Sequence, residues 1–174
     1  MSNNYESLVS LIRDIHIVED TTKLEEKGVM SIDISQFPRD SLYTLYKFDP
    51  ETYDLFPFFS KSKEASGLRD VCDYILLVDY AERLYILLFE LKHSNNDNNK
   101  AKRQLNATEC LIEYIIKSAE RIQKAIDRNQ IAIRKILIQE FTGRPKTRMY
   151  DVEYDRDKYV CYQLSSIHVR SLLK

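Results

Sequence analysis

Two carboxylates and one ammonium lie in the most apolar part of the sequence, where charged side chains are unusual. Asp73 stands at the start of one apolar run, and Glu90 and Lys92 stand at the end of the next. A buried, unpaired carboxylate is costly, and two carboxylates close together repel each other. A divalent cation removes both penalties, and Mg²⁺ prefers hard oxygen ligands of this kind. A neighbouring lysine could orient or deprotonate a metal-bound water, or stabilise charge that develops in the reaction.

The elements that must position these groups are two short runs rich in Ile, Leu, Val and Tyr, at residues 72–78 and 84–91. Both runs are continuous and bounded by polar residues, which is typical of strands buried on both faces. The polar residues 80–83 between them fit a four-residue connection. The sequence therefore predicts a β-hairpin.

The register of this hairpin decides whether the charged groups meet. If Asp79 faces Leu84, Asp73 lies directly opposite Glu90, with Cβ atoms roughly 5 Å apart. Lys92 is two residues beyond Glu90 and shares its face of the strand. A slip of one residue would place the two acids on opposite faces. The turn alone thus predicts a site with two carboxylates and an ammonium.

An Asp at the start of one strand and Glu-x-Lys at the end of the next resembles the motif of the PD-(D/E)xK nuclease superfamily, which has the restriction-endonuclease-like fold. The matching residues are Asp73, Glu90 and Lys92, and Cys72 stands where this family often has Pro. The resemblance covers residues 71–104. It implies a metal-dependent nuclease that hydrolyses phosphodiester bonds of nucleic acid, with DNA favoured and RNA left open, in repair, recombination, restriction or antiviral defence.

The resemblance also implies roles for individual residues. Asp73, Glu90 and the Leu91 carbonyl would hold Mg²⁺ or Mn²⁺, and Lys92 would position or activate the attacking water. Gln104 matches a Gln near the start of the following helix in several branches of the superfamily, although the Tyr a few residues on is missing. An N-terminal acid often joins such sites, and the sequence does not choose among four candidates: Glu6, Glu19, Glu25 and Glu26.

Simpler interpretations remain open for the same residues. Asp73 could be a turn residue at the start of a strand, Glu90 and Lys92 could be a surface pair, and Gln104 could be an exposed polar residue of a helix. The alternative function is a catalytically inactive nuclease-fold subunit that serves as a protein-binding or nucleic-acid-binding scaffold.

Periodicity along the rest of the chain predicts an α/β fold. With the resemblance, the expected architecture is a three-layer sandwich in which helices flank a central mixed sheet with a restriction-endonuclease-like core. We expect one nuclease-like domain over residues 1–174. Besides the hairpin, the expected elements are a helix at 5–19, a helix or extension at 19–27, a strand at 29–37, an aromatic loop or short helix at 41–59, a long helix at 100–129, strands at 130–141 and 158–164, and a short helix at 165–174.

Composition narrows the partners and the compartment. Three widely spaced cysteines, no secretory pattern and no apolar run of membrane-spanning length favour a reduced, cytoplasmic protein that does not enter a membrane. Residues 93–148 contain twelve Lys and Arg against six Asp and Glu. This excess fits either a nucleic-acid face or a solvated basic helix. The aromatic residues of 41–59 could stack on bases, pack on the core or form a homodimer contact, and a protein partner could deliver the substrate.

Overall fold

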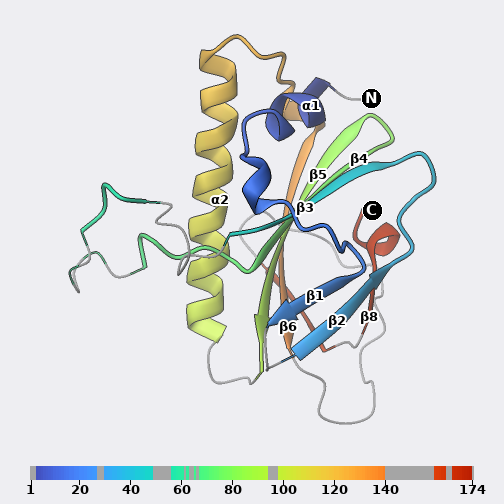
Figure 1. Ribbon diagram of the computed structural model, residues 1–174, viewed down its shortest axis with the longest axis vertical. Coiled ribbons are helices and arrows are strands. Elements are labelled where there is room, and N and C mark those ends of the chain that lie inside the picture. Colours follow the sequence, from blue (N-terminus) through green and yellow to red (C-terminus); the bar gives the residue numbers. More distant parts are fainter. Residues whose placement is uncertain are drawn as a thin grey trace.

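A five-stranded mixed sheet forms the centre of the computed structural model (Figure 1). The structure describes residues 3–26, 30–48, 56–60, 62, 65, 67–93, 98–139, 159–163 and 166–173. The strand order of the large sheet is β3-β4-β5-β6-β7. Its strands are β3 (Leu42–Lys47), β4 (Tyr74–Tyr80), β5 (Arg83–Lys92), β6 (Ile131–Gln139) and β7 (Tyr159–Gln163).

The direction of the strands changes in the middle of this sheet. β3, β4 and β5 pair antiparallel, whereas β6 runs parallel to β5 and β7 runs parallel to β6. The parallel step needs a crossover, which the helix α2 (Asn98–Arg121) provides between β5 and β6. α2 stands along one face of the sheet, together with the short helix α1 (Asn3–Val9) (Figure 1).

Apolar side chains of β4 and β5 alternate between two cores. Leu84, Ile86 and Leu88 point toward the helices, where they pack with Ala101 and Leu105 of α2. The alternate residues of β5, such as Leu87 and Phe89, point toward the other face. Both strands are buried along almost their whole length, as the continuous apolar runs predict.

A smaller sheet covers the second face. It has the order β1-β2-β8, with β1 (Lys23–Glu26) antiparallel and β8 (Ser166–His168) parallel to β2 (Met30–Ser35). Leu24, Ile32, Ile34 and Ile167 of this sheet share one apolar core with the large sheet. A 3₁₀ turn, Val169–Leu172, follows β8 and adds buried Leu172 to this core.

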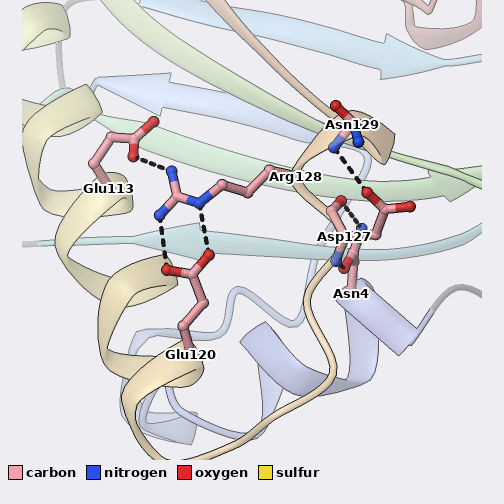
Figure 2. Close-up of polar contacts among 6 residues, drawn as sticks. All are labelled: Asn4, Glu113, Glu120, Asp127, Arg128 and Asn129. Carbon is pink, nitrogen blue, oxygen red and sulfur yellow. Dashed lines mark hydrogen bonds and ion pairs between the residues drawn. The ribbon is translucent and has the colours of Figure 1, made fainter.

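Polar contacts connect several elements near the C-terminal end of α2 (Figure 2). Arg128 donates to Glu120 Oε1 and Oε2 at 2.6 and 3.0 Å and to Glu113 Oε2 at 2.9 Å. Asn4 of α1 exchanges two hydrogen bonds with the backbone of Asp127, at 2.8 and 2.9 Å. These contacts join α1 and α2 to the short 3₁₀ helix Arg128–Gln130 that leads into β6.

The predicted α/β class and the mixed sheet are confirmed, as are the hairpin and the strands β2, β6 and β7. The long helix is also confirmed, but it ends at Arg121 and not at Asn129. The three-layer sandwich with a restriction-endonuclease-like core stays a prediction; in the part described, the face opposite α2 is covered by the small sheet. Among the described helices, none is long and apolar enough to cross a membrane.

Four predicted elements differ from the structure. The helix expected at 5–19 ends at Val9, and a 3₁₀ turn, Asp14–His16, follows. The charged residues after it form strand β1 and not a helix, and the aromatic region begins with strand β3. The closing helix is a short strand, β8, and a 3₁₀ turn. In each case, contacts with residues distant in the sequence outweigh the local preference for helix or loop.

Candidate functional site

The hairpin has the predicted register. Asp79 pairs with Leu84, and the ladder runs through Tyr74 opposite Phe89. The connection is shorter than expected, because Tyr80 and Arg83 also pair and only two residues remain in the turn. The register is unchanged by this difference, since the sum of paired residue numbers is the same. Asp73 and Glu90 therefore flank the open end of the β4–β5 ladder.

Asp73 lies directly before β4 and closes the ladder with its side chain. Its Oδ2 atom accepts a hydrogen bond from the Leu91 N–H at 2.7 Å. Burial raises the pKa of the Asp73 carboxyl above its ordinary value, while the Leu91 N–H and the Lys92 charge act in the opposite direction. The structure thus places this carboxylate against the strand that carries Glu90.

Glu90 is the most deeply buried of the charged groups, with no exposed surface. Burial raises the pKa of its carboxyl to about 8, and the negative charge of Asp73 adds to the effect. The Glu90 Oε1 atom forms an ion pair with Lys92 Nζ. The Asp73 backbone N–H lies close enough to lower the pKa of this carboxyl slightly, but within ordinary hydrogen-bond geometry Oε2 accepts no hydrogen bond from the residues that the structure describes. A buried carboxylate oxygen in this state is costly and favours a proton or a cation as its partner.

Lys92 lies at the solvent side of Glu90, and its side chain is 14% exposed. Burial lowers the pKa of its ammonium, but the ion pair with Glu90 and the negative charges of Asp73 and Glu26 outweigh burial, so the pKa lies above its ordinary value. Two acids share this one ammonium. The arrangement therefore keeps Lys92 charged and leaves the carboxylates as the groups that gain or lose a proton.

Helix α2 contacts the backbone just before Asp73. Gln104 donates from Nε2 to the Val71 carbonyl at 3.2 Å, and its buried Oε1 atom accepts no hydrogen bond from the described part of the chain. One turn later, Thr108 Oγ1 accepts a hydrogen bond from the Cys72 N–H at 2.7 Å. Gln104 thus lies next to the start of β4, where its side-chain amide is bonded to the backbone of Val71.

The structure brings Asp73, Glu90 and Lys92 together at one end of the hairpin. Leu91 contributes its backbone N–H, which donates a hydrogen bond to Asp73. The predicted role of the Leu91 carbonyl as a metal ligand stays a prediction. Gln104 lies at the margin.

Sequence reasoning left one neighbour of the site undecided and missed two others. Glu26, one of four acids left open, ends β1, and its charge acts on both Asp73 and Lys92. Gln139 is 4% exposed and pairs with Lys92 in the parallel β5–β6 register. Thr108 of α2 accepts the Cys72 N–H just before Asp73. The charge of Glu26 was a usable signal, whereas neither Gln139 nor Thr108 has a local pattern that could have shown its place.

The donor set has the chemistry that Mg²⁺ or Mn²⁺ needs. Two carboxylates with raised pKa values lie beside each other, and one buried oxygen of Glu90 accepts no hydrogen bond from the described residues. Magnesium is commonly held by one or two carboxylates, with water and substrate oxygens completing its shell. Within the described ranges, no three His, Cys, Asp or Glu side chains are grouped as a complete protein-only metal site. The residues present fit a magnesium-type site that shares its ion with substrate.

The chain matches no protein-family model, and neither the curated proteins nor the solved structures include a significant match to it. The geometry of the hairpin and its surroundings is therefore the basis on which a function is proposed.

Proposed function

We propose that this protein is a metal-dependent nuclease that hydrolyses phosphodiester bonds of nucleic acid, with DNA as the favoured substrate. The observation that carries the proposal is the register of the β4–β5 hairpin, which gathers Asp73, Glu90 and Lys92 at one end of a buried sheet. The raised pKa values of both carboxyls support it, because perturbed acids of this kind cluster at functional sites.

Asp73, Glu90 and the Leu91 carbonyl would hold Mg²⁺ or Mn²⁺. When bound, such an ion lowers the pKa of a coordinated water and neutralises charge on the phosphate. Glu26 is the N-terminal acid that the structure favours as an addition, since its charge already acts on the site. The Gln104 Oε1 atom is an acceptor that could orient a water from the side of α2.

Lys92 would act as a charged donor. The pKa of its ammonium lies above its ordinary value, so the group is protonated at neutral pH and is poorly suited to remove a proton. An ammonium in this position can bind a non-bridging phosphate oxygen and stabilise the negative charge that grows on it during attack. Of the roles open to this lysine, we therefore propose orientation and charge stabilisation.

The finer fold assignment belongs to the same proposal. The meander β3–β4–β5, followed by α2 and the parallel strand β6, supports a restriction-endonuclease-like core in a single domain over residues 1–174. A cytoplasmic role in restriction, antiviral defence or repair, a partner that delivers substrate, and homodimerisation are further parts of the proposal that stem from the sequence resemblance.

Titration with Mn²⁺ and cleavage assays test the proposal. We expect the wild-type protein to bind Mn²⁺ in calorimetry and to cut plasmid or single-stranded DNA when Mg²⁺ or Mn²⁺ is present. Asp73→Asn should abolish Mn²⁺ binding and cleavage, because it removes a ligand charge. Lys92→Ala should retain Mn²⁺ binding but lose cleavage by about 100-fold or more, as typical for loss of an electrostatic stabiliser.

Two exposed positions provide matched controls. Asp40→Asn removes a carboxylate near Tyr80 and Ala81 at the opposite, turn end of the hairpin, and Lys117→Ala removes an ammonium from α2 about 20 Å along the helix from Gln104; both should leave binding and cleavage unchanged. Equal activity in wild type, Asp73→Asn and Lys92→Ala would remove the nuclease hypothesis, because the cleavage would then come from another site or from a contaminant.

The ion pair between Lys92 and Glu90 favours a second candidate, an inactive nuclease-fold scaffold. This pair satisfies part of the buried charge without a metal, so the same residues could be structural. In that case calorimetry should show no Mn²⁺ binding, Lys92→Ala should destabilise the fold, and a protein or nucleic-acid partner should bind equally well with and without divalent cations.

A further inference from the structure

Thr108 has an unusual environment for a helical threonine. It lies in α2, facing the sheet, and has no exposed surface. Its hydroxyl donates to the Gln104 carbonyl at 2.8 Å, four residues earlier in the helix. The same oxygen accepts the Cys72 N–H at 2.7 Å. Both hydrogen-bonding capacities of the hydroxyl are thus used inside the protein.

The Cys72 amide needs such a partner because it lies outside the sheet ladder. The pairs of β4 with its neighbours begin at Tyr74, so the residues just before the strand are not held by β3 or β5 through backbone pairing. Instead α2 holds them twice, at Val71 through Gln104 and at Cys72 through Thr108. Asp73 follows directly, and only one peptide unit separates it from the Thr108 contact.

We propose that Thr108 is a positioning residue that sets the Asp73 carboxylate by fixing the Cys72 amide. The hydrogen bond from Leu91 N–H to Asp73 Oδ2 requires the backbone of residues 72–73 to hold one position relative to β5. Thr108 fixes that position from α2 through its hydrogen bond with the Cys72 N–H. As far as metal binding is concerned, the inference rests on the proposed function. The effect on the Asp73–Leu91 hydrogen bond does not.

The chemistry of the side chain explains why a hydroxyl is needed here. A β-branched residue in a helix has few χ1 rotamers, and the bond to the carbonyl four residues back fixes the hydroxyl proton. The remaining lone pairs then face the Cys72 N–H. Valine has nearly the same shape but would leave that buried N–H without an acceptor, whereas serine would keep the acceptor.

Amide hydrogen exchange measured by NMR tests the inference. In Thr108→Val we expect the Leu91 amide to exchange about tenfold faster relative to the Leu87 amide of the same strand, because the Asp73 acceptor is displaced. Thr108→Ser should restore wild-type exchange at Leu91. If Thr108→Val does not fold, Thr108→Ala removes the same hydroxyl and gives the same readout.

Lys135→Met is the matched control. Lys135 of β6 is buried and bonds to Asn106 and Glu109 of α2 at 3.0 and 2.8 Å, so its loss also loosens the helix from the sheet. It should lower global stability without a selective change at Leu91. If Leu91 and Leu87 accelerate equally in Thr108→Val, as they would in the control, Thr108 has only a general structural role and the inference is wrong.

A Mn²⁺ titration of the same variants links the inference to the proposed function. Thr108→Val should weaken Mn²⁺ binding about tenfold, as is typical when a group that orients a ligand is lost. Thr108→Ser and Lys135→Met should bind as wild type does. If the wild-type protein binds no Mn²⁺ and cuts no DNA, the proposed function fails, while the exchange of Leu91 still decides whether Thr108 positions Asp73.

Discussion

At the scale of single residues, Glu90 dominates the energetics of the site. Its carboxyl is fully buried, lies next to Asp73 and has only the Lys92 ammonium as an ionic partner among the described residues. A buried ion pair recovers only part of the desolvation penalty of its members. The native protein therefore tends to keep a proton on this pair of acids when no cation is bound, and this tendency has a measurable consequence for stability.

We predict that the free energy of unfolding falls as pH rises from about 4.5 to about 8, with EDTA present. The pKa of Glu90 is about 8 in the folded chain against an ordinary 4.5, so in this window the native state binds more protons than the unfolded state. The raised pKa of Asp73 acts in the same direction. Urea unfolding at several pH values should show a loss of about 4 kcal/mol across the window, since each pKa unit corresponds to about 1.4 kcal/mol.

Glu90→Gln should flatten this profile and make the apo protein more stable at pH 8, since the amide carries no charge to bury. The exposed Glu6→Gln is the control and should leave the profile as in wild type. A wild-type profile that rises with pH over the same range would contradict the assignment of Glu90 as the group with the raised pKa.

At the scale of elements, the hairpin was predictable because its information is local. Two apolar runs of similar length around a short polar interruption permit few registers, and the one that pairs Asp79 with Leu84 brings the charged groups together. The turn itself was predicted as four residues because Tyr80 and Arg83 look like loop residues. They pair in the structure because the large right-handed twist of a hairpin suits a two-residue turn.

The elements that could not be predicted are those defined by distant partners. β1 is mostly charged and buries fully only Leu24, so its sequence resembles a solvated segment. β3 lies among aromatic residues and prolines, and only its place beside β4 shows that it is a strand. For the same reason, the sequence could not choose Glu26 among four N-terminal acids and gave no sign of Gln139 or Thr108, since each reaches the site through a different tertiary contact.

The turn of the hairpin provides a prediction at this scale. Ala81 and Glu82 both have positive φ, at 51° and 61°, a region that side chains with a Cβ adopt at a cost. The double substitution Ala81→Asn, Glu82→Gly supplies the residues that such turns favour and should stabilise the protein by about 1 kcal/mol in thermal or urea unfolding.

A glycine placed elsewhere is the control for this substitution. Lys117→Gly, on the exposed side of α2, should cost about 1 kcal/mol because the backbone there is right-handed helical. If the double substitution in the turn destabilises the protein to a similar extent, the turn does not have the left-handed geometry described.

At the scale of the whole molecule, one tyrosine ties the two sheets together near the site. The Tyr74 hydroxyl at the start of β4 accepts from the Glu25 N–H at 2.9 Å and donates to the Glu25 carbonyl at 2.8 Å. The Lys47 ammonium of β3 also donates to that carbonyl, at 3.1 Å. β1 is thereby anchored across the end of the large sheet, which brings Glu26 toward Asp73.

We predict that Tyr74→Phe loosens the small sheet without unfolding the large one. The Glu25 backbone groups lose a buried partner, at a cost of about 1–3 kcal/mol. Hydrogen exchange should show faster exchange at residues 23–26 and unchanged exchange in β5. Tyr85→Phe is the control, because Tyr85 is buried in the same core but its hydroxyl makes no hydrogen bond with the described residues. If amide exchange in Tyr74→Phe becomes faster to the same extent in β1 and β5, the Tyr74 hydroxyl does not act as a local anchor of β1.

The two-residue turn makes the proposed site depend on chain length more than on the identity of the turn residues. Asn, Asp or Gly could replace Ala81 or Glu82 and leave Asp73 opposite Glu90. A single inserted codon between them would shift the strand by one position, so that Lys92 and Glu90 would face the small sheet while every residue of the motif was still present in the sequence. In related sequences, a gap at this turn should therefore mark loss of function even where Asp, Glu and Lys are all retained.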